Sequence, residues 1–567
     1  MLFADTVFYN AKVVTVNSNN DIAEAVAVKN GRIMAVGCEE DIFPLCDCST
    51  ERVDLGGAMI LPGLHDAHVH ASDFIHNKHH LPCDACGSIA ELQDALRAYR
   101  PTAGSGWLLG NGLTQQVMDE DGGITRHALD AAVSNIPVIL VMWHGHGCVA
   151  NTAALVASGI DKDTPDPPGG VIERDAEGEP TGVMQEASAL QLMFRGMPRL
   201  SEDSIALRLE EMQKLMNSMG YTAYTDSTIG PGNNEREGGA SGEACLQAYQ
   251  KLLADGKMSC RVSVGFYSGR GGVQSAEILR EDLESGAIPV SADESWLSFH
   301  MLKFFCDGVD AAHTAWMKQD YADTPGNHGL SCFGAPGASD EEQEAELREI
   351  IRLAHRSGLQ IGIHCVGNKA VEKTIDAIIV AQQEYPMRGC RHCIIHGDTF
   401  GDPEALSRGA EAGIIISSQP ALAESMYEKT QSCVGEEFGD RMMGLRRLFD
   451  NGVVVAGGSD SIAGEFYDWR QGIRCAMERR SSLTGRLHRQ DLAITALEAL
   501  KMYTINAAYQ EFSENERGSV EPGKFADFTI IDGDLFALTP EEIGRVRVLR
   551  TVVNGKTVYE SDPPCNK

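Results

Sequence analysis

The central part of the chain alternates short apolar stretches with amphipathic stretches of helical period. The apolar stretches are rich in branched side chains, which is typical of strands buried on both faces of a parallel sheet. The segment 340–357 opens with Ser339 and Glu342 at capping-box spacing and carries one apolar face, as a helix does. We predict helices over 203–219, 242–255 and 340–357. We predict strands over 221–226, 261–266, 301–306, 361–364, 393–396, 414–418 and 453–456.

An eighth buried strand is predicted earlier in the chain. The apolar run 58–61 leads into the segment 64–70, where His68 and His70 are two residues apart and therefore lie on one face of a strand. Eight short strands that alternate with helices predict an α/β fold of the (β/α)8 TIM barrel type. A doubly wound open sheet is the alternative.

The two ends of the chain carry short β patterns of their own. Neither end is long enough for a sandwich by itself, so we predict that residues 1–60 and 512–567 pair into one composite β-sandwich domain. The barrel then occupies residues 61–511.

One part of that barrel region, residues 71–200, does not follow the regular alternation of strands and helices. It contains a helix-like piece at 88–99 and a buried strand at 137–142, among many Gly, Pro and His residues. We interpret it as an insertion after strand 1 that covers the site as a lid, because loops over a barrel mouth usually decide the substrate.

Composition and charge limit the classes of partner. Hydrophobic residues make up 43% of the 567 residues, enough for a large core, yet no run approaches the ~20 apolar residues of a membrane span. The formal net charge of −33 repels phosphate backbones and anionic lipids, so we expect a small-molecule substrate and neither nucleic acid nor a membrane. The chain does not start with a basic segment followed by an apolar one, so we expect a cytoplasmic protein.

The 16 cysteines are expected to be reduced thiols in such a protein. Two Cys-x-x-Cys pairs, Cys83/Cys86 and Cys390/Cys393, lie too far apart to form a joint zinc ribbon. The pattern does not fix the oligomeric state, although a homo-oligomer would suit the exposed helices of a barrel.

Candidate metal ligands follow several of the predicted strands. Reactive residues of a (β/α)8 barrel lie where its strands end and the next loops begin. At or near these ends the chain has His68, His70, Lys303, His364, His396 and Asp460. Each one alone has an ordinary explanation, such as a hydrogen-bonded core histidine or a helix-capping aspartate. Their convergence on one mouth favours a metal site.

Lys303 lies inside the apolar run 301–305, where a charged amine needs a partner. Burial lowers the pKa of a lysine and favours the neutral amine, which can add carbon dioxide to form an anionic carbamate. Such a carbamate can bridge two divalent metals. The alternative is an ion pair with Asp307 or Asp310.

The order His-x-His, Lys, His, His, Asp over eight strands resembles that of the amidohydrolase superfamily. Over nearly its whole length the chain is similar to the family 3, YtcJ-like branch. The segments that carry the resemblance are 61–70 (LPGLHDAHVH), 145–151 (GHGCVAN), 178–187 (GEPTGVMQEA), 303–308 (KFFCDG), 363–371 (IHCVGNKAV), 418–420 (SQP), 458–460 (GSD) and 521–528 (EPGKFADF).

The resemblance implies a barrel with a composite β-sandwich, Zn2+ at the site, and hydrolysis of an amide-type C–N bond, as in N-substituted formamide deformylases. The chain departs from the family at Ile395, where Glu often precedes the strand-six histidine, and at 367–370, where Gly-Asp-Arg-Ala is common. The segment 309–313 differs as well. These changes near the mouth bear on the substrate and not on the fold.

As a mechanism we hypothesise hydrolysis by metal-activated hydroxide. The first two histidines and Asp460 would hold one ion, the two later histidines a second, and a carbamylated Lys303 would bridge them. A single ion is the alternative, and Mn2+ or Fe2+ could replace Zn2+. Asp460 would orient the water and carry its proton to the leaving nitrogen. His146 is the candidate donor to the developing oxyanion.

Substrate contacts are predicted from positions in the insertion or after barrel strands. The candidates are Trp143, His144, Glu186, Asp226, His313 and Gln419. Any of these could instead serve packing. A deaminase is one alternative function, but such enzymes usually carry Glu three residues after a ligand histidine, where this chain has Gly367 and Thr399. A catalytically silent metal-binding barrel is the other, although no predicted ligand is missing.

Overall fold

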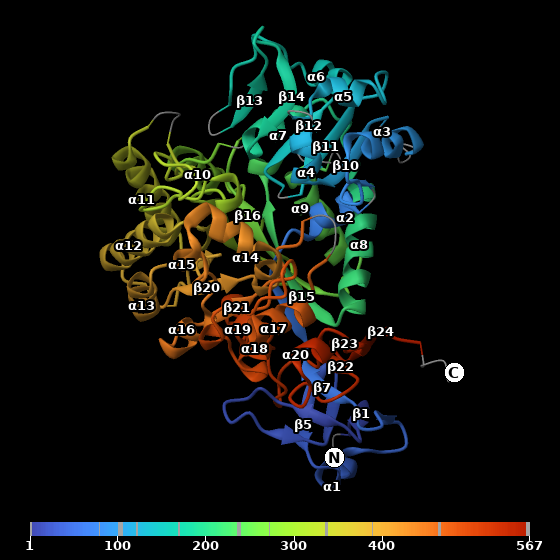
Figure 1. The fold of residues 1–567 in the computed structure, drawn as a ribbon. Helices are drawn as coiled ribbons and strands as arrows, with labels where there is room; N and C mark the ends of the chain where they lie inside the picture. The colour runs from blue at the N-terminus through green and yellow to red at the C-terminus, as the bar shows by residue number, and fades with distance from the viewer. Residues whose placement is uncertain are drawn as a thin grey trace.

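The computed structural model describes residues 3–562 except for 79, 100–105, 121–122, 144, 168–169, 235–239, 271–272, 335–337, 388 and 463–465. A barrel forms the middle of the molecule (Figure 1). The insertion lies above it in that view, and the β layers built from both ends of the chain lie below it.

The barrel consists of eight parallel strands that pair in the order of the chain. They are β8 (Leu64–Val69), β15 (Tyr221–Ile229), β16 (Arg261–Tyr267), β17 (Leu297–Phe305), β18 (Gln360–His364), β19 (Cys393–Ile395), β20 (Ile415–Ser418) and β21 (Val455–Gly457). The barrel closes between β8 and the segment that follows β21. There the Asp460 N–H donates to the His68 carbonyl at 2.8 Å. The predicted (β/α)8 barrel is confirmed.

Helices surround these strands and cover their outer faces (Figure 1). The main ones are α8 (Glu202–Ser218), α9 (Gly242–Ala254), α10 (Ala276–Ser285), α11 (Asp340–Arg356), α12 (Asn368–Glu384), α13 (Pro403–Glu411), α14 (Pro420–Val434), α16 (Leu445–Asp450), α17 (Trp469–Glu478), α18 (Ala496–Met502) and α19 (Ile505–Gln510). The capping box of Ser339 and Glu342 is present at the start of α11. Buried Leu347, Ile350 and Ile351 then face the strands, as the spacing predicts.

Two sheets form the composite β unit. One has the order β5-β4-β1-β6 and the other β24-β23-β22-β7-β2-β3. Their strands are β1 (Thr6–Tyr9), β2 (Lys12–Val14), β3 (Ile22–Ala23), β4 (Ala25–Lys29), β5 (Arg32–Gly37), β6 (Glu51–Asp54), β7 (Met59–Pro62), β22 (Phe528–Ile531), β23 (Val548–Val553) and β24 (Lys556–Glu560). Leu61 pairs with Thr529, so the two ends share one sheet, and Phe8 and Val26 of the other sheet pack against Phe528 in the core between them. The limits of this domain stay a prediction.

The insertion has a six-stranded sheet of its own with the order β13-β14-β12-β11-β10-β9. These strands are β9 (Leu81–Pro82), β10 (Leu108–Leu113), β11 (Val138–Met142), β12 (Gly147–Ala150), β13 (Val171–Arg174) and β14 (Pro180–Gln185). Its helices are α3 (Ile89–Ala98), α4 (Gln115–Asp119), α5 (Arg126–Asp130), α6 (Thr152–Ala157) and α7 (Ala187–Phe194). Only α3 and β11 follow from the sequence pattern, because the other strands are short or interrupted by glycine.

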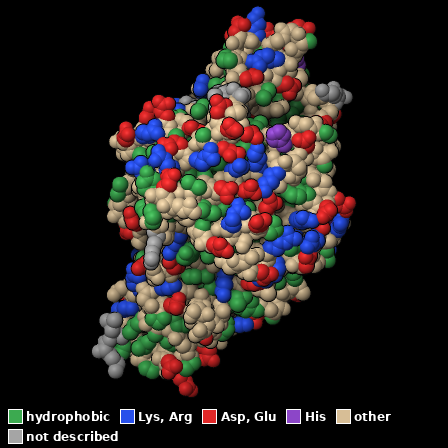
Figure 2. Space-filling view, turned by 90° about the vertical axis from the view of Figure 1, so that its left-hand side faces the viewer, with side chains coloured by type: hydrophobic (Ala, Val, Ile, Leu, Met, Phe, Trp, Pro, Cys, Tyr) green, Lys and Arg blue, Asp and Glu red, His purple; other side chains and the backbone are tan. Residues whose placement is uncertain are grey.

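The face drawn in Figure 2 carries Asp and Glu side chains interspersed with Lys and Arg. None of the helices in the described part of the chain is long and apolar enough to cross a membrane.

Candidate metal centre

The six predicted ligands lie at the carboxyl ends of the barrel strands. His68 is near the end of β8 and His70 follows it, while Lys303 lies in β17. His364 ends β18 and His396 directly follows β19, while Asp460 lies three residues beyond the end of β21. Parallel strands bring these ends to one mouth.

Asp460 lies among the histidines. Its Oδ1 is 3.2 Å from His68 Nε2 and 3.3 Å from His70 Nε2, and its Oδ2 is 3.7 Å from His396 Nε2. The imidazole rings of His364 and His396 are 4.7 Å apart. His68, His70 and Asp460 form a group whose ligand atoms lie within 4.8 Å of one another, which a metal ion fits.

The position of Asp460 depends on a close approach between the backbone at Gly458 and the backbone of β8. A Cβ at Gly458 would lie 2.7 Å from the backbone N and O of His68, so the chain can pass β8 here only with glycine. Asp460 itself has φ +55°, in the left-handed region. This turn directs its carboxylate back over β8.

Hydrogen bonds fix the ring orientations of two ligands. Ser227 Oγ is 2.8 Å from His68 Nδ1, which leaves Nε2 towards Asp460. His364 Nε2 is 3.1 Å from the Gly308 carbonyl and donates to it, which leaves Nδ1 as the ligand atom. Buried Lys303 Nζ has no hydrogen-bond partner among the described residues. Orphaned buried polar atoms of this kind fit a bound metal.

Burial sets the charges of the centre. It lowers the pKa of His68 and His364 well below the ordinary range and that of His396 to about 4, so these rings are neutral, the form that binds metals. Lys303 is completely buried, and burial lowers its pKa to about 8, against the opposing charge of Asp460.

The alternative role for Lys303, an ion pair with Asp307 or Asp310, is wrong. Asp307 accepts the backbone N–H groups of Trp316 (2.9 Å) and Gly367 (2.8 Å), and Asp310 accepts Thr430 Oγ1 at 2.6 Å. No ion pair of Lys303 exists within the described part of the chain.

The insertion brings His146 and Glu186 together. His146 Nδ1 and Glu186 Oε2 are 3.0 Å apart, and each side chain is about a quarter exposed. Trp143 lies under Lys429 of α14, with Nζ 4.6 Å from the ring. His144 lies outside the described residues.

The remaining substrate candidates differ in position. Gln419 is buried against His396 after β20. His313 pairs with Asp323 at 2.9 Å in the loop after β17. Asp226 is fully buried within β15, where its carboxylate accepts Tyr249 OH at 2.6 Å and the Ser72 N–H at 3.1 Å. Its role in substrate binding stays a prediction.

The sequence pattern also missed Asp66 and Ser227. Asp66 accepts the Ser459 N–H at 2.9 Å and so joins β8 to the segment after β21. Burial raises the pKa of Asp66 to about 7. Its position two residues before His68 was the available signal, whereas Ser227 gave none.

A second group of metal-type side chains, His355, Cys390 and His392, lies away from the mouth. The Ile361 N–H donates to His392 Nδ1 at 3.1 Å, so the ring proton is on Nε2, which donates to His355 Nδ1 at 2.9 Å. His392 Nε2 and His355 Nδ1, the two nitrogens that would have to bind an ion, are therefore hydrogen-bonded to each other. This group does not fit a metal.

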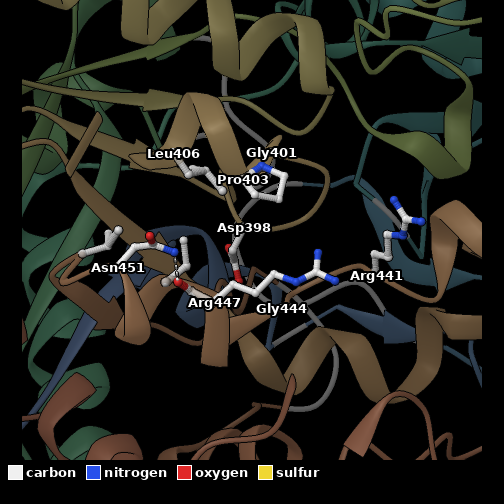
Figure 3. Close-up of a pocket in the computed structure, with 10 residues that line it drawn as sticks. Asp398, Gly401, Pro403, Leu406, Arg441, Gly444, Arg447 and Asn451 are labelled. Carbon is white, nitrogen blue, oxygen red and sulfur yellow. Dashed lines mark hydrogen bonds between the residues drawn. The ribbon is translucent and has the colours of Figure 1, made fainter. Parts of the chain in front are cut away.

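A small cavity lies between α13 and α16 (Figure 3). Its volume is about 20 Å³, room for about one water. Figure 3 shows Asp398 at its centre and Arg441 apart from it. It is too small to take a substrate.

The chain is similar to known proteins over nearly its whole length. The model of the Amidohydrolase family matches residues 51–559. The chain is 29% identical to the amidohydrolase YtcJ of Bacillus subtilis over 98% of this chain and 99% of that protein. It is 28% identical to an N-substituted formamide deformylase of Arthrobacter pascens over 98% of each. A solved metal-dependent hydrolase of Pyrococcus horikoshii superposes with a TM-score of 0.73 at 21% identity, covering 94% of this chain and 99% of that one.

Proposed function

Because the chain belongs to the amidohydrolase family, we propose that it is a metal-dependent hydrolase of an amide-type C–N bond in a small molecule. The observation that carries the proposal is the convergence of four imidazoles, a buried lysine and Asp460 on one barrel mouth. The deformylase relative supports formamides and related amides as the substrate class.

The proposed metal is Zn2+, which imidazole and carboxylate ligands suit. His68, His70 and Asp460 would hold one ion, and His364 and His396 a second. Lys303, carbamylated at Nζ, would bridge the two. Ions held here would polarise a carbonyl oxygen and lower the pKa of water, which makes hydroxide available near neutral pH.

The side chains do the remaining work. The Asp460 carboxylate lies 3.2 Å from His68 Nε2 and 3.3 Å from His70 Nε2, where it could take a proton from an attacking water held at the same centre. The same carboxyl group then delivers that proton to the leaving nitrogen. Asp460 is the most exposed of the proposed ligands, with 21% of its side chain accessible, as a proton carrier to substrate requires.

Deamination has less support. It needs a carboxylic acid to protonate the ring of the substrate, and the positions three residues after His364 and His396 hold Gly367 and Thr399. Amide hydrolysis needs no such acid.

A substrate screen tests the proposal. Zinc-loaded and manganese-loaded protein is incubated with N-substituted formamides, N-acyl amines and cyclic amides, and released amine is measured. We expect turnover of at least one class, and its loss in Asp460→Asn with the metal retained. Full metal content with no turnover in any class would contradict the proposal, as would an Asp460→Asn variant of near wild-type activity.

A further inference from the structure

The register of two strands in the insertion places His146 opposite Glu186. In the antiparallel pair of β12 and β14, Gly147 is the partner of Gln185. His146 precedes the one and Glu186 follows the other, so both stand at the same end of the pair. The Glu186 N–H donates to the His146 carbonyl at 2.7 Å, and the side chains meet at 3.0 Å. Backbone and side chain therefore link the same two residues.

The backbone at Glu186 is held in a conformation that favours glycine. Its φ is +68° and its ψ is 157°, directly before α7. A residue other than glycine is strained at a positive φ of this kind, and such strained residues are concentrated at functional sites. The turn aims the carboxylate at the imidazole.

Contacts with the barrel join this end of the insertion to the loop that follows Asp460. Asn111 Nδ2 donates to the Asn77 carbonyl at 2.9 Å, and Asn77 Nδ2 donates to the Ile462 carbonyl at 2.9 Å. Ile462 is two residues beyond Asp460, and a Cβ at Gly145 would lie 4.0 Å from its side chain. The loop that carries His146 thus packs against the loop that carries Asp460.

The charges around His146 favour its protonated form. Burial alone would lower its pKa, but Glu186, with a smaller contribution from Asp460, raises it above the ordinary value. His364 also faces this ring and repels its charge. Only the imidazolium has protons on both nitrogens, one for Glu186 and one at Nε2.

We propose that Glu186 is a positioning residue that acts through His146. By accepting the Nδ1 proton it fixes the ring and stabilises the imidazolium, whose Nε2–H donates a hydrogen bond to the carbonyl oxygen of the substrate. This rests on the proposed function, and it replaces the expectation that Glu186 binds substrate directly. The insertion is then part of the reaction machinery as well as a cover.

A double-mutant cycle tests this inference with the best amide from the screen. We expect His146→Ala to lower kcat roughly 10²-fold, as the loss of one oxyanion donor does. Glu186→Ala should approach that loss with little change in KM. Glu186→Gln should fall between, because the amide oxygen still accepts the Nδ1 proton without a charge. In the His146→Ala background, Glu186→Ala should change nothing further. The inference would be overturned if the kcat losses of His146→Ala and Glu186→Ala multiplied in the double variant, or if Glu186→Ala raised only KM.

A second measurement does not depend on turnover. The imidazole nitrogens of His146 are followed by NMR in the full-length, zinc-loaded protein with 15N-labelled histidine, and His146→Ala assigns the signal. Loss of the Glu186 charge should move the titration of the ring to lower pH in Glu186→Gln. Glu173→Gln on β13 of the same sheet is the control and should leave it unchanged. An unchanged midpoint in Glu186→Gln would overturn the inference even if no amide is turned over.

Discussion

Substituting Gly458 by Ala should disable the metal centre without removing any ligand. The added Cβ would lie 2.7 Å from the backbone N and O of His68, where ordinary contacts begin near 3.4 Å. The backbone of His68 must therefore retreat by roughly 0.7 Å, the difference between these two distances. The distance of 3.2 Å between His68 Nε2 and Asp460 Oδ1 would widen by a similar amount.

Metal ligands tolerate displacements of about 0.2 Å, and a misplacement of about 1 Å lowers catalysis about 10²-fold. We therefore expect Gly458→Ala to lose metal affinity and to lower kcat/KM about 10²-fold. Overpacking should also destabilise the fold by about 1–3 kcal/mol. The assays are chelator competition and amide turnover. Gly37→Ala is the control, because its Cβ would meet nothing closer than 3.8 Å. Wild-type affinity and turnover in Gly458→Ala would refute the reasoning.

Three further predictions concern the supporting structure. Arg261 Nε and Asp527 Oδ2 form a buried ion pair of 2.7 Å between the barrel and the terminal sheet. Arg261→Met should lower the free energy of unfolding in urea by about 3–5 kcal/mol, and no change would contradict this. Ser227→Ala removes the hydrogen bond to His68 and should weaken metal binding about 10- to 100-fold in chelator competition, whereas unchanged affinity would refute its orienting role. Removing metal with a chelator should lower the thermal midpoint and reloading should restore it, because an ion that binds only the folded state stabilises it.

The barrel and most of the metal centre could be predicted from two features of the sequence: the period of its apolar residues and the positions of polar residues at strand ends. Short apolar strands and one-sided helices follow directly from burial, and the polar residues that interrupt them mark the strand ends. His364 and Asp460 were found in this way. Their distances and ring orientations depend on long-range contacts, such as that of Gly458 with β8, which no local pattern encodes.

The direction in which the Asp226 side chain points could not be predicted from the sequence. Thr225 contacts His65 and Ser227 contacts His68 inside the barrel, so alternation turns Asp226 towards the helices. The alternation of side chains along β15 is predictable, but which alternate residues point into the barrel is not, since all nine residues of the strand are buried.

The sheet of the insertion was missed for another reason. Strands such as Leu108–Leu113 contain glycine and lack a clear alternation, so neither a helical nor a strand period stands out. The pairing of His146 with Glu186 depends on that sheet and could not be predicted from the sequence.

The most direct test of the proposed two-metal centre is the metal content per chain, measured by elemental analysis for wild type and Lys303→Ala side by side. Cys390→Ser serves as the control, because its group does not fit a metal. We expect two zinc ions in wild type and in Cys390→Ser, and one or none in Lys303→Ala. One ion in wild type and in Lys303→Ala alike would contradict the bridging carbamate. No metal in wild type after loading with zinc or manganese would contradict the catalytic centre itself.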